Sequence, residues 1–451
     1  MPLPFYRRLA TAPSALRNWY RDLPRATRLS FSREITATLP IAVVTAVMGA
    51  GFCGFVARKG LGMSDGFLAI LMASNMLGLM VTGPLIGFFH NTPKIVIIKR
   101  LILFASVLLC SILYLKADHL SPYLGSCFFV VLTALIQTAI ALVASLRTTL
   151  WRTNYPDGDR AKLVVIYMLM VALVNSGSIF FFSYLMDRWN ISFHWIYFIS
   201  GLFGVCGALL FTRIRIRRES SVLRKINEEP NPPVRLFAGL AMLKRDKPFR
   251  LYMILQMFNG LSVLMVEVVL VIILADTFQA DWIEGGAALT AIPLLFMGLA
   301  APVWSRYFDR HNIFKVRFFS TLAWAISRLT LMTAVTLGSL PLVLISRVFS
   351  GIAMGGGQLA WRLGHMEFAP KDEDSLYMGA HISLTGIRGI VAPFLGIALY
   401  NLMGAVWLFA LTSVSLILIA LAFHLMPRFL PKAQRHAKDK ATLALQHQRT
   451  P

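Results

Sequence analysis

The chain has 451 residues, 57% hydrophobic and only 14% charged, yet its 44 Lys and Arg exceed its 21 Asp and Glu to give a formal net charge of +23. Soluble domains carry about 25% charged residues, and nucleic-acid-binding proteins show their basic residues on a polar surface, so the mean hydropathy of +0.66 excludes both classes. The composition also excludes a disordered chain and a disulfide scaffold, and it indicates a membrane protein whose charges are confined to its loops.

Twelve apolar runs are long enough to cross a bilayer, since about 20 helical residues cross a hydrocarbon core of roughly 30 Å. Helices are the only open structures that satisfy their own backbone in lipid. We therefore predict an all-α polytopic membrane protein with twelve transmembrane helices in two six-helix bundles. The predicted spans are residues 35–57, 65–89, 95–115, 123–150, 162–186, 194–213, 249–275, 285–308, 313–336, 340–366, 376–400 and 403–426.

A polar interruption from Arg213 to Pro248 separates six spans from six. Its charges and prolines are typical of a solvated connector that can hold a short amphipathic helix. The N-terminal segment has no continuous apolar run, so we expect no cleavable signal peptide, with an organellar transit peptide as the alternative. The predicted parts are a basic segment (1–33), an N-terminal bundle (34–213), a linker (214–248), a C-terminal bundle (249–426) and a basic tail (427–451).

The basic residues predict the orientation, because cytoplasmic loops retain Lys and Arg. If the N-terminus is inside, 36 basic residues lie on the cytoplasmic side and 4 on the opposite side. Both termini are therefore predicted to be cytoplasmic, in the inner or plasma membrane. The remaining four basic residues lie within spans; they are Arg147, Arg328, Arg347 and Arg388.

The two halves repeat each other at a nearly constant offset. Gly83-Pro84 in the second span recurs as Ala301-Pro302 in the eighth, 218 residues later, and Asn91 matches Asp309 at the same offset. Proline and an acidic loop follow both the fourth and the tenth span. A duplication of six spans is the simplest explanation.

In topology and motifs, residues 34–426 resemble the major facilitator superfamily of secondary transporters. This family carries a pattern of the form GxxxGxxxDRxGRR between the second and third spans. The first copy here keeps Gly83 and Gly87 but has Asn91 in place of the acid, and the second copy keeps Asp309 and Arg310. The resemblance implies a gating motif at these five residues, with its charge in the C-terminal copy.

A second family pattern, an Arg followed four residues later by Gly, normally belongs to the fourth span. Here it occurs in the tenth span, as Arg347 and Gly351. Small residues at this spacing also let helices approach closely. Helix packing alone is therefore the alternative interpretation of these glycines.

Ionisable groups inside the hydrocarbon are expensive and indicate function. Arg388 is twelve residues from the predicted start of the eleventh span, about 18 Å along the helix and so near the midplane. Glu267, in the seventh span, is the one acid that we place well inside a span. The resemblance implies that the seventh, tenth and eleventh spans face a central cavity, so Glu267 is predicted to pair with Arg347 or Arg388.

The other charged positions receive weaker predictions. Arg328 lies in the ninth span, which the resemblance makes peripheral, so we expect its side chain to snorkel to the interface. Arg147 lies about one turn from the end of the fourth span; we interpret it as interfacial, with gating or anion entry as the alternative. His365 and His381 are expected to be ordinary interfacial histidines.

Five uncharged amides fall within spans two, four, five and seven. Buried amides in lipid need hydrogen-bond partners. Interhelical hydrogen bonds explain part of this set, and the others are candidates for substrate contact near the midplane. The amides are Asn75, Gln137, Asn175, Gln256 and Asn259.

The sequence has no pattern typical of an enzyme, metal site or cofactor site. It contains no HExxH, GxSxG or P-loop, and we expect no metal and no cofactor other than a coupling proton. The four cysteines lie in apolar runs without metal spacing and are interpreted as small buried hydrophobes; they are Cys53, Cys110, Cys127 and Cys206.

The leading hypothesis is a secondary transporter of a small anionic or zwitterionic solute that works by alternating access and is coupled to protons. Arg388 and Arg347 outnumber Glu267 in the predicted pathway, which favours a negative substrate. Hydrophobic drug efflux is the alternative, followed by a transporter-like membrane sensor. We expect a monomer whose partners are its substrate and the lipid bilayer, with no nucleic acid.

Overall fold

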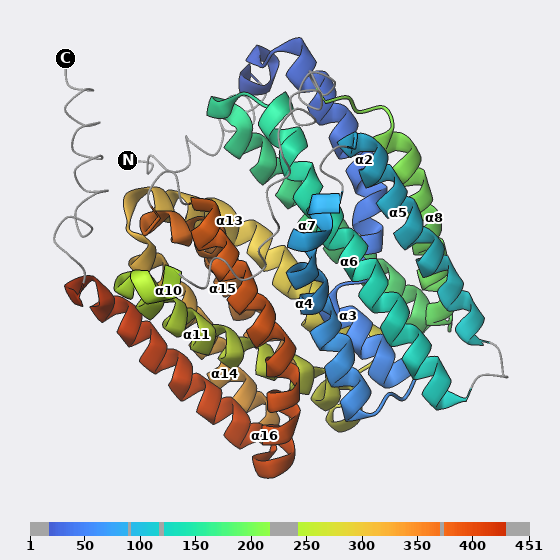
Figure 1. Ribbon diagram of the computed structural model, residues 1–451. Coiled ribbons are helices and arrows are strands. Elements are labelled where there is room, and N and C mark those ends of the chain that lie inside the picture. Colours follow the sequence, from blue (N-terminus) through green and yellow to red (C-terminus); the bar gives the residue numbers. More distant parts are fainter. Residues whose placement is uncertain (1–17, 89–91, 117–120, 217–241, 370–373, 430–451) are drawn as a thin grey trace, which may run out of the picture.

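The computed structural model describes residues 18–88, 92–116, 121–216, 242–369 and 374–429. Within these ranges the chain is helical and contains no strand. Among the described residues, eleven helices are long and apolar enough to cross a membrane. The all-α polytopic class predicted from the sequence is thereby confirmed, and Figure 1 shows the helices as two bundles that lie side by side.

The two bundles follow each other along the chain (Figure 1). The elements of the N-terminal bundle are α2 (Arg25–Val47), α3 (Ala50–Phe55), the π-helical turn η1 (Val56–Gly60), α4 (Asp65–Phe88), α5 (Lys94–Ser111), the 3-10 turn η2 (Ile112–Lys116), α6 (Pro122–Asn154), α7 (Asp157–Arg188) and α8 (Phe193–Phe211). The elements of the C-terminal bundle are α10 (Met242–Arg245), α11 (Lys247–Ile272), the π-helical turn η4 (Ile273–Thr277), α12 (Trp282–Gly286), the π-helical turn η5 (Ala287–Ala291), α13 (Ile292–Arg310), α14 (Ile313–Thr336), α15 (Leu340–Leu363), the 3-10 turn η6 (Gly364–Glu367), α16 (Asp374–Leu425) and the 3-10 turn η7 (Met426–Phe429).

Side-chain caps fix where several spans begin. Ser121 accepts a hydrogen bond from the Leu124 amide at the start of α6, and proline follows it at the first helical position. Asp246 caps α11 and Asn312 caps α14 in the same way. These caps satisfy amides that have no partner inside the helix.

The last two predicted spans form one continuous element, α16, with 52 residues. The chain turns inside it at Gly404, where φ is 78° and ψ is 172°. With this turn, the helices correspond to the twelve predicted spans. The first helix differs from the prediction, because α2 begins at Arg25 rather than near residue 35 and extends beyond the apolar run.

The first span is broken between α2 and α3, at Met48 and Gly49. The break leaves backbone carbonyls without helical partners. The side-chain amide of Gln137 donates to the Met48 carbonyl, and the Tyr197 hydroxyl donates to the Val47 carbonyl at 3.3 Å. Both donors come from other helices of the same bundle, so tertiary hydrogen bonds stabilise the break.

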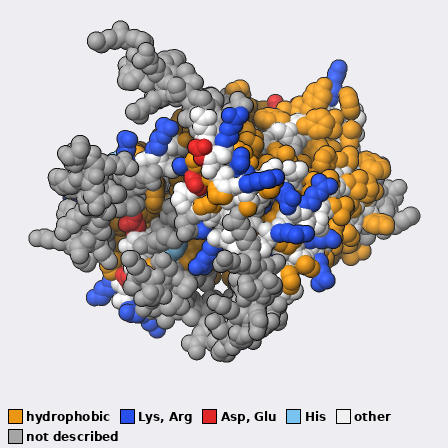
Figure 2. Space-filling view, turned by 90° about the horizontal axis from the view of Figure 1, so that it is seen from above, with side chains coloured by type: hydrophobic (Ala, Val, Ile, Leu, Met, Phe, Trp, Pro, Cys, Tyr) orange, Lys and Arg blue, Asp and Glu red, His pale blue; other side chains and the backbone are white. Residues whose placement is uncertain are grey.

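The surface of the bundles is apolar along the helices and basic at one end. Large hydrophobic side chains such as Val107 and Val131 are 63% and 55% exposed, as expected where lipid is the solvent. Figure 2 looks onto the end at which α2 begins and shows many Lys and Arg side chains there with few acidic ones. Exposed basic residues at this end include Arg25, Arg33, Arg152, Arg213 and Arg215. We call the opposite end, where Arg58 lies, the Arg58 end.

Replacing Gly404 by Ala tests the turn inside α16. Its backbone conformation is essentially restricted to glycine, so Gly404→Ala is expected to lower the free energy of unfolding by about 1–3 kcal/mol. Gly177→Ala is the matched control, because a methyl group there meets nothing within 4 Å and the site is helical. Unfolding titrations in detergent check this; equal stability of the two variants would contradict the strained turn.

A buried ion cluster and a seam between the bundles as the candidate functional site

Glu267 lies at the centre of a cluster of ionised side chains inside the C-terminal bundle. Its carboxylate accepts from Arg347 on α15 through two hydrogen bonds of 2.9 and 3.1 Å and from Arg328 on α14 at 3.0 Å. Arg328 and Arg347 are 0% and 2% exposed, whereas the Glu267 side chain is 26% exposed. One carboxylate therefore balances two buried guanidinium groups, and the cluster keeps a net positive charge.

The cluster confirms one sequence prediction and corrects another. Pairing of Glu267 with Arg347 was predicted and is observed. Arg328 does not snorkel; it lies fully buried against the Trp324 ring, 5.0 Å from its centroid, and also donates to the Val263 carbonyl. Depth along a helix can be estimated from the sequence, but the face that a side chain occupies cannot.

Arg388 does not belong to this cluster. Its guanidinium donates to the Gln256 backbone carbonyl, and its stem crosses α11 at Gly260, where any side chain would collide with it. It is 9% exposed. Of the two predicted partners of Glu267, Arg347 is therefore the one observed, and Arg388 has no carboxylate partner among the described ion pairs.

A second buried arginine, Arg317 on α14, lies near Arg388. It is 4% exposed and donates to the Tyr252 hydroxyl at 3.4 Å. The Gln256 amide, turned so that its oxygen faces the guanidinium, accepts from Arg317 at 2.9 Å. The predicted site residue Gln256 is thus brought together with Arg388, in a region that is cationic and lacks a carboxylate within the described ion pairs.

The remaining amides have structural partners or lie apart from the cluster. Asn259 accepts from the Thr321 hydroxyl at 3.2 Å. Asn175 lies 3.2 Å from the Thr45 hydroxyl. Asn75 is half-buried on α4. Interhelical hydrogen bonding therefore occupies Gln137, Asn175 and Asn259, and substrate contact at these residues stays a prediction.

Sequence reasoning missed a second buried carboxylate, Glu34 in the N-terminal bundle. Glu34 is 0% exposed and accepts from the Trp151 indole at 2.8 Å and from the Tyr155 hydroxyl. Arg147 lies 3.8 Å away and donates to the Tyr167 hydroxyl. Arg147 is only 4% exposed, so its side chain lies inside the bundle, and its position at the membrane interface stays a prediction. Glu34 was overlooked because it precedes the apolar run.

The two predicted interfacial histidines are also buried. His381 is 1% exposed, and its Nδ1 atom lies 3.4 Å from the Met253 sulfur. The centroids of the His381 and Trp361 rings are 5.4 Å apart. His365 is 4% exposed. Both rings are therefore enclosed by protein and do not lie at a polar surface.

An ion pair joins the two bundles at the Arg58 end. The Arg58 guanidinium donates to Asp276 at 3.0 and 3.1 Å and lies 3.1 Å from Asp65. Arg58 and Asp276 are 218 residues apart, the same offset that relates the two halves of the sequence. Arg58 lies in the π-helical turn η1 and Asp276 in the π-helical turn η4, so the bundles touch through corresponding parts of their first spans.

Backbone contacts extend this junction. Lys59 donates to the Ala280 carbonyl, and Asp187 on α7 accepts from the Trp282 and Ile283 amides at 3.0 and 2.7 Å. An Asp at a helix N-terminus also interacts favourably with the helix dipole. We call this junction the seam; it comprises Arg58, Lys59, Ser176 and Asp187 of the N-terminal bundle with Asp276, Ala280, Trp282, Ile283 and Ala291 of the C-terminal bundle.

Close backbone packing completes the seam deeper in the bundles. The Ser176 hydroxyl donates to the Ala291 carbonyl at 3.0 Å. A Cβ at Gly51 would lie 2.5 Å from the Leu289 carbonyl oxygen, so only glycine fits there. The broken first span thus packs directly on the π-helical turn η5.

The predicted gating motif lies on α4 and α13. Gly83 and Gly87 fall within α4, Asp309 and Arg310 fall at the end of α13, and Arg310 is exposed. Asn91 lies outside the described residues. Gly351 of the second pattern packs against the Pro293 carbonyl, where a Cβ would be only 2.6 Å away, so this glycine serves helix packing.

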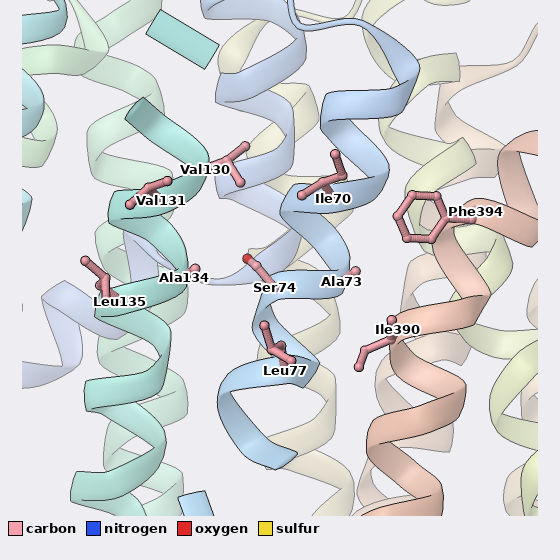
Figure 3. Close-up of a pocket in the computed structure, with 10 residues that line it drawn as sticks. All are labelled: Ile70, Ala73, Ser74, Leu77, Val130, Val131, Ala134, Leu135, Ile390 and Phe394. Carbon is pink, nitrogen blue, oxygen red and sulfur yellow. The ribbon is translucent and has the colours of Figure 1, made fainter. Parts of the chain in front are cut away.

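An apolar pocket of about 380 Å³ lies between α4, α6 and α16 (Figure 3). Helices of both bundles contribute to it, but none of the predicted pathway residues does. Several of its side chains are well exposed, including Leu135 at 43% and Phe394 at 45%. The lining residues are Ile70, Ala73, Ser74, Leu77, Val130, Val131, Ala134, Leu135, Ile390 and Phe394.

Comparison with known proteins gives one family and a set of similar folds. The profile of the Major Facilitator Superfamily matches residues 36–286 and 252–450. No curated protein sequence matches the chain. A crystal structure of the nucleoside transporter NupG has a TM-score of 0.66 and 12% identity, covering 88% of this chain and 98% of that chain.

Two further structures have the same fold at low identity. The xylose transporter XylE from E. coli, in an inward open conformation, has a TM-score of 0.63 and 15% identity over 90% of this chain and 96% of that chain. A POT family transporter in complex with a thioalcohol conjugated peptide has a TM-score of 0.63 and 17% identity over 90% and 97%. At these identities the similarity concerns the fold alone.

The buried charges predict different effects on stability for two neutralising substitutions. Glu267→Gln leaves two buried guanidinium groups without a counter-ion and is expected to cost about 3 kcal/mol of unfolding free energy, the lower end for broken buried ion pairs because the carboxylate is partly exposed. Arg388→Gln removes a charge that has no carboxylate partner, so stability should stay within about 1 kcal/mol or rise. Denaturation in detergent compares the two; equal losses would contradict the assignment of Glu267 as the counter-ion.

Proposed function

Because the chain belongs to the major facilitator superfamily, and so is a multi-pass membrane transporter and not an enzyme, we propose that it carries a small anionic or zwitterionic solute by alternating access. The observation that carries this proposal is the asymmetry of the bundle contacts. Among the described residues, polar contacts between the bundles gather in the seam, toward the Arg58 end. Alternating access requires such a junction to break and re-form while a central site changes sides.

We assign the Arg58 end to the outside of the inner or plasma membrane. The excess of basic residues in the loops at the opposite end supports this orientation, and Figure 2 displays them on the corresponding face. With this orientation, the described polar contacts between the bundles lie toward the outside of the membrane.

The negative charge of the substrate is proposed from Arg388 and Arg317. Both guanidinium groups lie at least nine-tenths buried, without a carboxylate partner in the described ion pairs. A buried cation without a counter-ion is costly, and a bound anion would lower that cost. Arg388 is the better candidate for direct contact because its helix, the eleventh span, faces the cavity according to the family resemblance.

Proton coupling is proposed for Glu267. Its side chain is 26% exposed, whereas Glu34 is fully buried behind Trp151 and Tyr155, so Glu267 is the more accessible of the two carboxylates. Protonation of Glu267 would remove the charge that holds Arg347 and Arg328. A carboxylate that changes partners on protonation is a suitable coupling group.

Transport in liposomes tests the substrate charge. Purified protein is assayed for uptake of radiolabelled carboxylates, phosphate, nucleosides, sugars and amino acids. We expect flux of a negatively charged or zwitterionic solute that falls at least tenfold in Arg388→Gln and is partly retained in Arg388→Lys. Flux of neutral solutes alone, or an unchanged rate in Arg388→Gln, would contradict the anion proposal.

The same liposomes test proton coupling. An imposed pH gradient is expected to drive accumulation by the unmodified protein, and Glu267→Gln should abolish this accumulation while leaving exchange between equal solute pools measurable. Glu34→Gln is the comparison, because that carboxylate is not proposed to couple. Gradient-driven accumulation that persists in Glu267→Gln would overturn the proposal.

Hydrophobic efflux is the second candidate, favoured by the apolar pocket between the two bundles (Figure 3). Filling this pocket by Ala134→Phe should reduce export of lipophilic dyes at least fivefold if the pocket holds substrate, with Leu402→Phe, at an exposed position elsewhere on α16, as the control. Dye export that is unaffected by Ala134→Phe would leave the anion transporter as the only proposal.

A further inference from the structure

Arg347 touches two different parts of the molecule at once. Its two terminal nitrogens bind the Glu267 carboxylate, at 2.9 and 3.1 Å, while its Nε atom donates to the Ala288 carbonyl at 2.8 Å. Ala288 belongs to the π-helical turn η5, which lies in the seam. The guanidinium therefore connects the charged carboxylate to the surface where the bundles meet.

The π-helical turn explains why this contact exists. In a π-helix each amide bonds the carbonyl five residues earlier, which widens the turn. Such turns are rare in proteins, and those that occur are often found at functional sites. Two carbonyls of η5 are used outside the helix, Ala288 by Arg347 and Ala291 by Ser176 of the other bundle. The turn thus has one side bonded to the ion cluster and the other bonded across the seam.

The other face of η5 packs on the break in the first span. Leu289 lies directly against Gly51, and the Thr290 methyl group would be 3.7 Å from a Cβ at Gly49. All five residues of η5 are buried, with exposures of at most 6%. A displacement of the turn toward or away from α3 would therefore open or close the seam at this depth, because no side chain on the glycines can buffer the movement.

From these contacts we infer that Arg347 is a positioning residue that transmits the charge state of Glu267, through η5, to the seam. This inference rests on the proposed function, because it requires the Arg58 end to open during transport. While Glu267 is charged, it holds the Arg347 guanidinium in the orientation in which Nε donates to the Ala288 carbonyl. When Glu267 is neutral, the bidentate pair is lost, Arg347 no longer holds η5, and the seam loosens.

Arg328 provides an internal control for this inference. It binds the same carboxylate at 3.0 Å, but its other hydrogen bond goes to Val263 on α11, the helix that carries Glu267. It has no described contact with η5. Both arginines balance the charge of Glu267, whereas among the described hydrogen bonds only those of Arg347 connect the carboxylate to η5.

Thr290 offers a probe of the seam. It is 5% exposed, and its hydroxyl has no hydrogen-bond partner, so Thr290→Cys should be tolerated. In closed vesicles, a membrane-impermeant methanethiosulfonate added outside reacts with this cysteine only when the seam opens. The four native cysteines set a background rate, which is measured in the chain that keeps Thr290 and then subtracted.

Substitutions are compared in the Thr290→Cys chain. Glu267→Gln and Arg347→Lys are expected to raise the labelling rate about tenfold, because lysine keeps the charge but cannot bond the carboxylate and Ala288 together. Arg328→Lys should stay within twofold of the parent. The double variant of Glu267→Gln with Arg347→Lys should label no faster than Glu267→Gln alone, since both act on one connection.

Three results would overturn the inference: equal acceleration by Arg328→Lys and Arg347→Lys, no acceleration by Glu267→Gln, or blocked labelling in every variant. If Arg347→Lys does not yield monodisperse protein, Ser350→Ala replaces it. This substitution removes a hydrogen-bond acceptor that lies 3.1 Å from the Arg347 guanidinium. Ser350→Ala should raise the labelling rate at least threefold, and an unchanged rate would count against the inference. Labelling needs no substrate, so the expected pattern without any solute flux would reject the proposed transport and keep the relay.

Discussion

The interaction on which the C-terminal bundle depends is one carboxylate shared by two buried arginines. Glu267, Arg328 and Arg347 come from α11, α14 and α15, so this cluster fixes the relative positions of three helices. In a low-dielectric interior such ions persist only because they neutralise each other, and removal of one partner leaves a charge that the surroundings cannot solvate. The cluster is therefore a stabilising element and also a point at which a single proton can change the packing.

The second constraint is the seam, which joins matching parts of the two halves. Arg58 and Asp276 are related by the sequence repeat, so the ion pair lies where a pseudo-twofold relation brings equivalent turns together. Its members are partly exposed, at 21% and 43%, which makes this contact weak compared with the buried cluster. A weak junction at the surface, backed by close backbone packing at Gly51, is suited to a contact that must break in every cycle.

The sequence predicts the helices well and the side-chain partners only in part. Apolar runs define the spans, and a charged residue within such a run is rare enough that Glu267 and Arg347 stand out. Arg328 was misjudged because an apolar run fixes depth but not the face of the helix. Glu34 was missed because α2 begins at Arg25, before the run. The Arg58–Asp276 pair could have been found from the 218-residue offset that relates the halves.

Packing details were beyond sequence reasoning for a physical reason. The break at Met48 and Gly49 and the π-helical turn η5 are decided by tertiary contacts, since Gln137 and Tyr197 satisfy the freed carbonyls from other helices. No local sequence pattern predicts such tertiary contacts. Gln137 therefore ranked as a substrate-pathway candidate, although its amide serves the first span.

The central claim is that the seam opens and closes as the transporter works. The most direct measurement places spin labels at Ser64→Cys and Thr277→Cys, exposed positions on either side of the seam, and records their distance by electron paramagnetic resonance in lipid nanodiscs. A control chain that keeps Ser64 and Thr277 is labelled in the same way, and its signal, which comes from the native cysteines, is subtracted. The account predicts two distance populations, one matching the closed seam and one longer, whose ratio changes when a transported solute is added. A single unchanged distance in a preparation that transports solute would contradict it.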